Sequence, residues 1–135
     1  HVPPILMRML INAKGRDGVI IITDATLGAG LPPGTKFSLL GIPARTTEKV
    51  AVMDDGTGLA GSTLTMIEGV QRVHQLAGVP LVDAVRMATL NPAKQLRREK
   101  EFGSLARGKR ADLVWFDREF RVRGVWVDGV AKFRS

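Results

Sequence analysis

The residue best suited to chemistry is Asp24, which follows an apolar run and Thr23. Residues 19–22 are Val-Ile-Ile-Ile, and a Gly- and Pro-rich loop occupies residues 24–34. Continuous β-branched residues predict a strand buried on both faces of a parallel sheet. Ligands of such sheets bind at the carboxyl ends of the strands, where Asp24 would lie. A short carboxylate on a rigid strand end can serve as a general base, although Asp also caps helices and closes Asx turns.

The neighbours of Asp24 are small or hydroxylated. Thr23 can help to hold the carboxylate, and Ala25, Gly28 and Gly30 leave room for a substrate. Such surroundings favour a functional role for Asp24 over a purely local one.

A second candidate site is the small-residue loop formed by Leu59, Ala60, Gly61 and Ser62, ahead of a helix predicted over about 63–77. Little side-chain bulk beside N–H groups at a helix start suits an anionic or polyhydroxylated ligand. Many helices begin in this way without binding anything, so this stretch alone is weak support for a site.

Neither histidine belongs to a metal-binding motif. His1 and His74 lie far apart in the sequence, and His74 fits an ordinary helix position. The sequence has no HxH or HExxH pattern and no Cys for a thiolate ligand. Residues 54–58, DDGTG, lack the spacing of a calcium loop and predict a turn. No self-sufficient metal site is therefore expected in this chain.

The elements that must position these residues follow an α/β pattern. Residues 3–14 predict a helix with Pro3 and Pro4 in its first turn that ends at Gly15, and a strand over 19–23 follows. A β-hairpin excursion is expected at about 36–53, and helices at about 63–77, 80–89 and 92–99. The apolar face expected for the first helix consists of Leu6, Met9, Leu10 and Ala13.

Strand-like residues dominate after Gly103, and Asp128-Gly129 is a strong signal for a two-residue hairpin. Three antiparallel strands are too few to be stable alone. We expect them to complete a sheet begun elsewhere in the chain.

Composition excludes several classes of protein. The 135 residues, 44% of them hydrophobic, can build one core. No apolar run approaches the roughly 18 residues of a membrane span, and the absence of Cys fits a cytoplasmic protein. The net charge of +7 is scattered, without a basic helix or a set of stacking aromatics, so we expect no nucleic-acid partner. The first residue is His1, which suggests a piece of a longer chain or a processed product.

Several stretches together resemble the C-terminal portion of the N-acetylglucosamine-6-phosphate deacetylases, within the amidohydrolase superfamily. The resemblance covers nearly the whole chain in the family's order, and LAGSTLTM after TDA is its most specific part. The stretches are HV at 1–2, TDAT at 23–26, DGTGLAGSTLTMIEGV at 55–70, MATLNPA at 87–93 and GSLARGKRADLVWFD at 103–117.

This resemblance implies an α/β fold: the C-terminal part of a (β/α)8 TIM-like barrel plus strands of a small β-sandwich domain. The barrel part would span residues 1–102, including the excursion at about 36–53, and the sandwich strands residues 103–135. The implied reaction removes the acetyl group from N-acetylglucosamine 6-phosphate, giving glucosamine 6-phosphate and acetate. The family likeness also implies a homodimer.

The resemblance also implies roles for individual residues. Asp24 matches the catalytic aspartate, which would take a proton from a metal-activated water and deliver it to the departing amine. His1 matches a substrate-contacting histidine, and residues 59–62 match the loop that contacts the sugar phosphate. A divalent metal is implied, zinc first, with iron, manganese or cobalt as alternatives. Its ligands would lie upstream, with Asp24 as a further candidate, so this chain alone is expected to be inactive.

Two other interpretations stay open. One is another amidohydrolase, such as an N-acetylgalactosamine-6-phosphate deacetylase or a cyclic amidase, which would share the aspartate. The other is a non-catalytic fragment or assembly module, favoured by the absence of metal ligands in these 135 residues.

Overall fold

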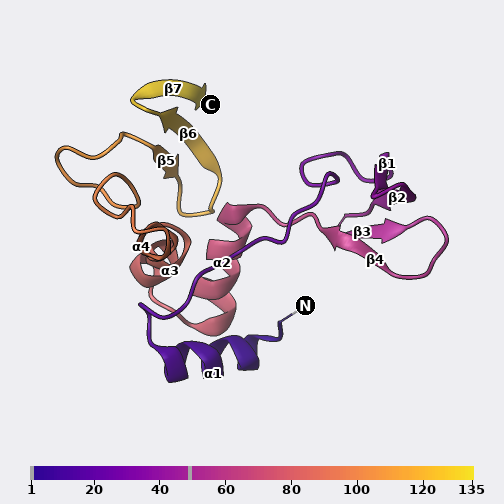
Figure 1. Ribbon diagram of the computed structural model, residues 1–135, viewed down its shortest axis with the longest axis horizontal. Coiled ribbons are helices and arrows are strands. Elements are labelled where there is room, and N and C mark those ends of the chain that lie inside the picture. Colours follow the sequence, from indigo (N-terminus) through magenta and orange to yellow (C-terminus); the bar gives the residue numbers. More distant parts are fainter. Residues whose placement is uncertain (1, 49) are drawn as a thin grey trace. The chain divides into compact units, whose positions relative to one another are not determined.

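The computed structural model describes residues 2–48 and 50–135. They form two compact units: the chain up to Ile21 together with Val70–Ser135, and Ile22–Gly69. We refer to them as the helical unit and the strand unit, and Figure 1 labels their elements. Among the described residues, no helix is both long and apolar enough to cross a membrane.

The helical unit contains four helices: α1 (Pro4–Lys14), α2 (Met66–Ala77, which begins in the strand unit), α3 (Leu81–Ala88) and α4 (Leu90–Gln95). Its core is made of buried apolar side chains from α2, α3, the connection between them and the extended segment after α1. These side chains are Ile21, Val70, Val73, Ala77, Val79, Ala84 and Met87.

Helix α1 begins one residue later than predicted, since Pro3 is its N-cap, and ends where the sequence predicts, but it packs through a different face. Pro4 opens it and the N–H of Gly15 closes it onto Ile11 O at 2.8 Å. Met7 and Ile11 pack against the core, whereas the predicted inner residues Leu6, Met9 and Leu10 are half exposed or more. The prediction of that face was wrong, because periodicity identifies apolar positions and not the surface that covers them.

The Val19–Ile22 run does not form the predicted strand. Only Ile21 is buried, and Ile22 is 73% exposed. The described residues supply no neighbouring strand for residues 19–23. A strand exists only when a partner accepts its hydrogen bonds. Here the N–H of Ile21 donates instead to Met87 O at 3.0 Å.

The turn before this run is held by a buried amide. Asn91 is 3% exposed, and its Nδ2 donates to Arg16 O and to Val19 O, each at 2.7 Å. Asn91 falls between the helices predicted at about 80–89 and 92–99. In the structure it lies inside α4, and the break between α3 and α4 falls at Thr89.

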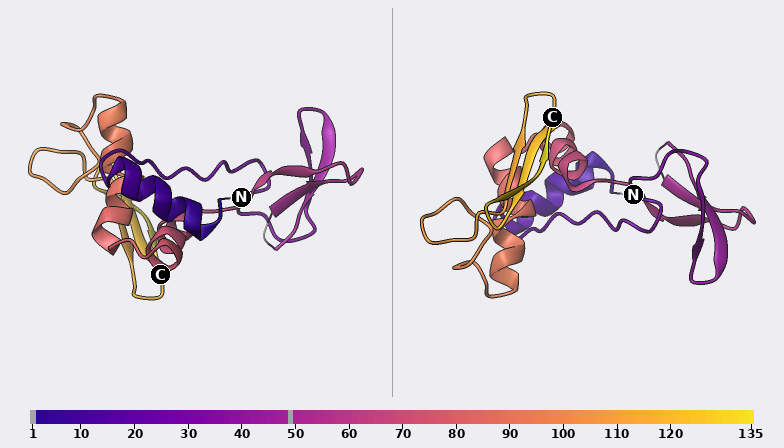
Figure 2. Two further views of the ribbon diagram at one scale, coloured as in Figure 1. Left: turned by 90° about the horizontal axis from the view of Figure 1, so that it is seen from below. Right: turned by 90° about the horizontal axis from the view of Figure 1, so that it is seen from above.

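Among the described residues, the C-terminal strands form a three-stranded antiparallel sheet of their own, and do not complete a sheet begun elsewhere in the chain as expected. Its order is β5 (Leu113–Phe116), β6 (Val122–Val127), β7 (Val130–Arg134), and the strands lie side by side in both views of Figure 2. Asp128 and Gly129 both have positive φ, 53° and 77°, as a type I′ hairpin turn requires. The division of the chain at residues 102 and 103 stays a prediction.

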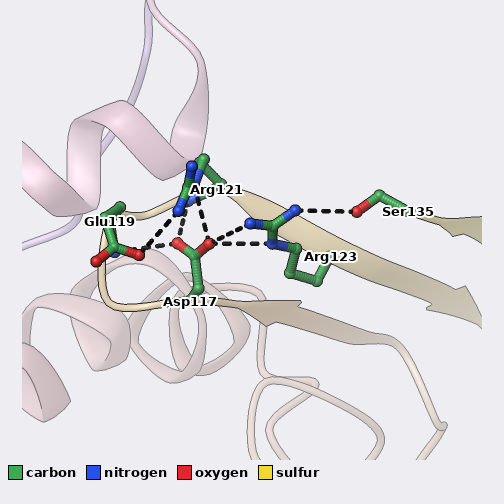
Figure 3. Close-up of polar contacts among 5 residues, drawn as sticks. All are labelled: Asp117, Glu119, Arg121, Arg123 and Ser135. Atoms are coloured by element: carbon green, nitrogen blue, oxygen red, sulfur yellow. Dashed lines mark hydrogen bonds and ion pairs between the residues drawn. The ribbon is translucent and has the colours of Figure 1, made fainter.

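The turn between β5 and β6 is fastened by Asp117 (Figure 3). Its carboxylate accepts hydrogen bonds from the backbone N–H of Glu119 and Arg121 and from the side chains of Arg121 and Arg123. Partial desolvation raises the pKa of Asp117, but the Arg121 N–H and the two guanidinium groups outweigh it and lower the pKa to about 2. Arg123 also donates to Ser135 Oγ at 3.3 Å, so the network reaches β7 and the chain end.

The strand unit is a four-stranded antiparallel meander. Its strands are β1 (Lys36–Leu39), β2 (Ile42–Thr46), β3 (Val50–Met53) and β4 (Leu59–Ser62), in that spatial order. Three fully buried alanines, Ala44, Ala51 and Ala60, form its small core. The excursion predicted at 36–53 is therefore present, and it extends by one further strand.

Candidate active site

Asp24 lies at a strained point of the backbone. Its φ is +52°, in the left-handed region that non-glycine residues rarely adopt. Immediately after it, Ala25 forms a parallel bridge with Ser62 of β4. Strain of this kind persists only where surrounding contacts hold it, and it gathers at functional sites.

Backbone hydrogen bonds tie Asp24 to β4. The N–H of Ser62 donates to Asp24 O at 3.3 Å, and the N–H of Thr26 donates to Ser62 O at 3.1 Å. The two stretches that the sequence singled out, Asp24 and residues 59–62, are thus adjacent in the structure. This adjacency joins positions nearly forty residues apart in the chain.

The carboxylate of Asp24 has no structural task among the described residues. It is exposed and takes part in no hydrogen bond or ion pair with residues 2–48 or 50–135. The N–H of Thr26, which an Asx turn of Asp24 would use, donates instead to Ser62 O at 3.1 Å. Asp24 is therefore neither a helix cap nor the acceptor of an Asx turn, and its oxygens are available to a ligand.

Residues 59–62 form a strand and not the loop that was predicted. Strand β4 pairs with β3, and α2 begins only at Met66. Small residues suit this strand because its inner side packs on the alanine core. Ala60 is fully buried, Leu59 is 51% exposed, and Gly61 and Ser62 are half-buried. The substrate contacts assigned to these four residues stay a prediction.

The glycines of the 24–34 loop differ in their surroundings. A Cβ on Gly28 would meet the ring of Phe37 at 2.9 Å and Thr46 Cγ2 at 3.0 Å. The absent side chain of Gly28 therefore makes room for the unit's own packing and not for a substrate, which corrects the sequence-based expectation. A Cβ on Gly30 would meet nothing within 4 Å.

The histidines contribute little to this region. His1 lies outside the described residues, so its predicted substrate contact stays a prediction. His74 is a structural residue of the helical unit: its Nδ1 lies 2.7 Å from Val79 O, and its ring lies 6.1 Å from that of Phe120.

The described residues do not provide a metal site. No group of three or more His, Asp or Glu side chains comes together among residues 2–48 and 50–135. The DDGTG stretch is the turn that was predicted. Asp55 Oδ1 accepts from Thr57 N at 2.9 Å and from Thr57 Oγ1 at 2.7 Å, and these bonds lower the pKa of Asp55. A single carboxylate at residue 24 is too few ligands for a divalent cation.

Thr26 is a residue of the site that sequence reasoning missed. Its Oγ1 donates to Ala60 O at 3.1 Å, and its methyl group faces Gly61. TDAT was part of the family resemblance, but nothing local distinguishes this Thr from a loop residue. Only the pairing with β4 reveals its contacts.

Comparisons with known proteins identify the family of this chain. The model of the amidohydrolase family matches residues 7–132. The chain is 38% identical to the N-acetylglucosamine-6-phosphate deacetylase of Vibrio furnissii, and 36% identical to an N-acetylgalactosamine-6-phosphate deacetylase of Escherichia coli O157:H7. Each alignment covers 96% of this chain, and 32% and 33% of the two relatives, respectively.

A solved structure is also similar to this chain. The crystal structure of the N-acetylglucosamine-6-phosphate deacetylase from Pasteurella multocida superposes with a TM-score of 0.88 at 35% identity, over 98% of this chain and 34% of that one. The chain thus spans about a third of the length of each of these three proteins. The match to the family model over residues 7–132 shows that this chain belongs to the amidohydrolase family.

Proposed function

We propose that this chain is the C-terminal part of an N-acetylglucosamine-6-phosphate deacetylase. The whole protein would hydrolyse the acetamide of N-acetylglucosamine 6-phosphate to acetate and glucosamine 6-phosphate. The relatives named above support this substrate class, since all three act on N-acetylated hexosamine 6-phosphates by name.

One observation carries the proposal: Asp24 presents an uncommitted carboxylate from a strained backbone position that β4 holds in place. A general base must be ionised, reachable and accurately positioned. Structural carboxylates in this chain look different. Asp117, for example, is engaged by two arginines.

The chemistry proposed for Asp24 is a proton transfer in two directions. As a water oxygen attacks the acetamide carbonyl carbon, the carboxylate of Asp24 accepts the proton that the water loses. When the carbon–nitrogen bond then breaks, the protonated Asp24 gives that proton to the sugar nitrogen, which would otherwise leave as an unstable amide anion. Acetic acid and the amine are formed, the proton of the acid passes to the amine to give acetate and the ammonium form of the sugar, and Asp24 is again a carboxylate.

Amidohydrolases are in general metal-dependent, and we propose a divalent metal for the whole protein, zinc before iron, manganese or cobalt. A bound metal would supply Lewis-acid chemistry. The described residues lack a ligand set, so the ligands would come from outside this chain. The 135-residue chain alone is accordingly expected to release no acetate and to retain no metal on dialysis.

N-acetylgalactosamine 6-phosphate is the second candidate substrate, because the chain is 36% identical to a deacetylase named for that sugar. The two sugars differ only at C4. Measuring kcat/KM for acetate release from both sugar phosphates with the full-length protein tests the proposal. A higher value for the glucosamine derivative supports it, a higher value for the galactosamine derivative favours the second candidate, and no release from either refutes both.

The proposal includes a cytoplasmic homodimer, which rests on the family resemblance. Light scattering of the full-length protein would give twice the monomer mass if the dimer is correct. Cell fractionation checks the location. Metal analysis of the full-length protein separates the enzyme from a non-catalytic assembly module, which would carry no stoichiometric metal.

A further inference from the structure

We propose that Thr26 is a positioning residue that fixes Asp24 against β4. This inference rests on the proposed function of Asp24. Thr26 lies two residues after Asp24 and contacts β4 through its backbone, its hydroxyl group and its methyl group. All of these contacts lie within the strand unit.

The hydroxyl and the backbone N–H of Thr26 bind two positions of β4 on either side of Gly61. Oγ1 donates to Ala60 O at 3.1 Å, and the N–H donates to Ser62 O at 3.1 Å. Ala60 is fully buried. Without the hydroxyl, its carbonyl would lose this donor in a place that bulk water does not readily reach.

The methyl group of Thr26 occupies the space beside Gly61. A Cβ on residue 61 would lie 2.3 Å from Thr26 Cγ2 and 3.2 Å from Oγ1. Gly61 also has φ +102°, which an L side chain rarely adopts. The hydroxyl therefore makes the hydrogen bond to β4, and the methyl only fills the space that Gly61 leaves, so Ser keeps the bond and Val keeps the shape without it.

These contacts matter for Asp24 because its own conformation is unfavourable. Asp24 has a φ of +52°. Before it, Thr23 Oγ1 accepts a hydrogen bond from Ala25 N, and after it Ala25 forms the bridge with Ser62. The hydrogen bonds from Thr26 to Ala60 O and Ser62 O hold the C-terminal side of this bend against β4. If that side loosens, the backbone of Asp24 can relax toward a common conformation, which moves the carboxylate from the place where the proton must be taken.

The test uses three substitutions in the full-length protein. Thr26→Val keeps the shape and removes the hydroxyl, Thr26→Ser keeps the hydroxyl and removes the methyl, and Thr57→Val is the matched control. Thr57 is an exposed Thr whose Oγ1 bonds Asp55 within the 54–58 turn. We measure kcat and KM for acetate release, and amide hydrogen exchange at Thr26 and Ser62.

A small misplacement of a reacting group costs up to about a hundredfold in rate. We therefore expect Thr26→Val to lower kcat about tenfold or more while KM changes less than about threefold, and Thr26→Ser to keep kcat within about threefold of wild type. Exchange at the Ser62 amide should accelerate in Thr26→Val only. Thr57→Val should match wild type in every measurement.

Equal kcat for Thr26→Val and wild type would overturn the inference, as would a loss in Thr26→Ser as large as in Thr26→Val. If Thr26→Val does not fold, Thr26→Ala replaces it. In that case, equal kcat values for Thr26→Ala and Thr26→Ser overturn the inference. If the wild-type protein releases no acetate, the proposed function fails on its own. The exchange rates then decide whether Thr26 fastens Asp24 to β4: unchanged Ser62 exchange in Thr26→Val refutes it.

Discussion

Gly61→Ala should destabilise the protein through two effects that the chain itself allows to be separated. Gly61 combines positive φ with close contact to Thr26. Gly56 has φ +75°, but a Cβ added there would meet no atom within 4 Å, and Gly58 has neither feature. In the same unit, Gly61→Ala therefore carries the cost of positive φ and the cost of the close contact. Gly56→Ala carries the cost of positive φ alone, and Gly58→Ala carries neither.

The magnitudes follow from this comparison. Left-handed φ costs an L residue about 1–2 kcal/mol, and overpacking costs about 1–3 kcal/mol. We expect a loss of about 2–5 kcal/mol in unfolding free energy for Gly61→Ala and about 1–2 kcal/mol for Gly56→Ala. Gly58→Ala should lie within about 0.5 kcal/mol of wild type. The entropy that Ala removes from the unfolded chain is common to all three changes, so it cancels in the differences.

The assay is urea denaturation of the full-length variants, followed by circular dichroism. Combining Thr26→Ser with Gly61→Ala adds a direct check, because Ser lacks the Cγ2 atom at 2.3 Å. The double variant should recover at least about 1 kcal/mol relative to Gly61→Ala alone. If Gly61→Ala costs no more than Gly56→Ala, or if the double variant recovers nothing, the contact between Thr26 and β4 is wrong.

Further predictions concern the helical unit and the cofactor. Asn91→Ala should lower the free energy of unfolding by about 2–4 kcal/mol, because the carbonyls of Arg16 and Val19 lose their donor. The control Asn12→Ala, at an exposed position, should change the free energy of unfolding little. Denaturant titration measures both variants. Asp117→Asn should have a lower Tm than wild type at pH 7, and the difference in Tm should shrink toward pH 2. The reason is that a carboxyl whose pKa is lowered to about 2 stabilises the fold above its unfolded pKa of 3.8. This stabilisation is lost as the pH falls through 2. Chelation should abolish acetate release by the full-length protein, and added zinc should restore it.

Features set by neighbouring residues were predictable from the sequence. Gly15 ends α1, and Asp128-Gly129 closes the last hairpin, because both depend on φ preferences within a few residues. The start of α2 is similarly local: Thr65 and Glu68 bond one another's backbone N–H groups in a capping box.

Features that depend on a distant partner were not predictable. The Val19–Ile22 run has the composition of a strand, but strand pairing needs a neighbour that the described residues do not supply. The side chains of Leu59–Ser62 suit a loop or a strand equally well, and pairing with β3 decides between them.

The candidate site also contains one residue that the sequence could reveal and one that it could not. Asp24 was identifiable because a carboxylate at the end of a strand-like apolar run is unusual in itself. The role of Thr26 was hidden, since its partner Ala60 is 34 positions away, and a Thr in a Gly- and Pro-rich loop has many ordinary explanations.

The central claim is that the Asp24 carboxylate carries a proton from the attacking water to the leaving nitrogen. The most direct measurement is kcat of full-length Asp24→Asn with N-acetylglucosamine 6-phosphate, beside circular dichroism to verify the fold. The amide is nearly isosteric and cannot accept the proton, so kcat should fall about 10²–10⁴-fold or more while the spectrum stays that of wild type. Turnover within a few-fold of wild type in a correctly folded variant would contradict the account.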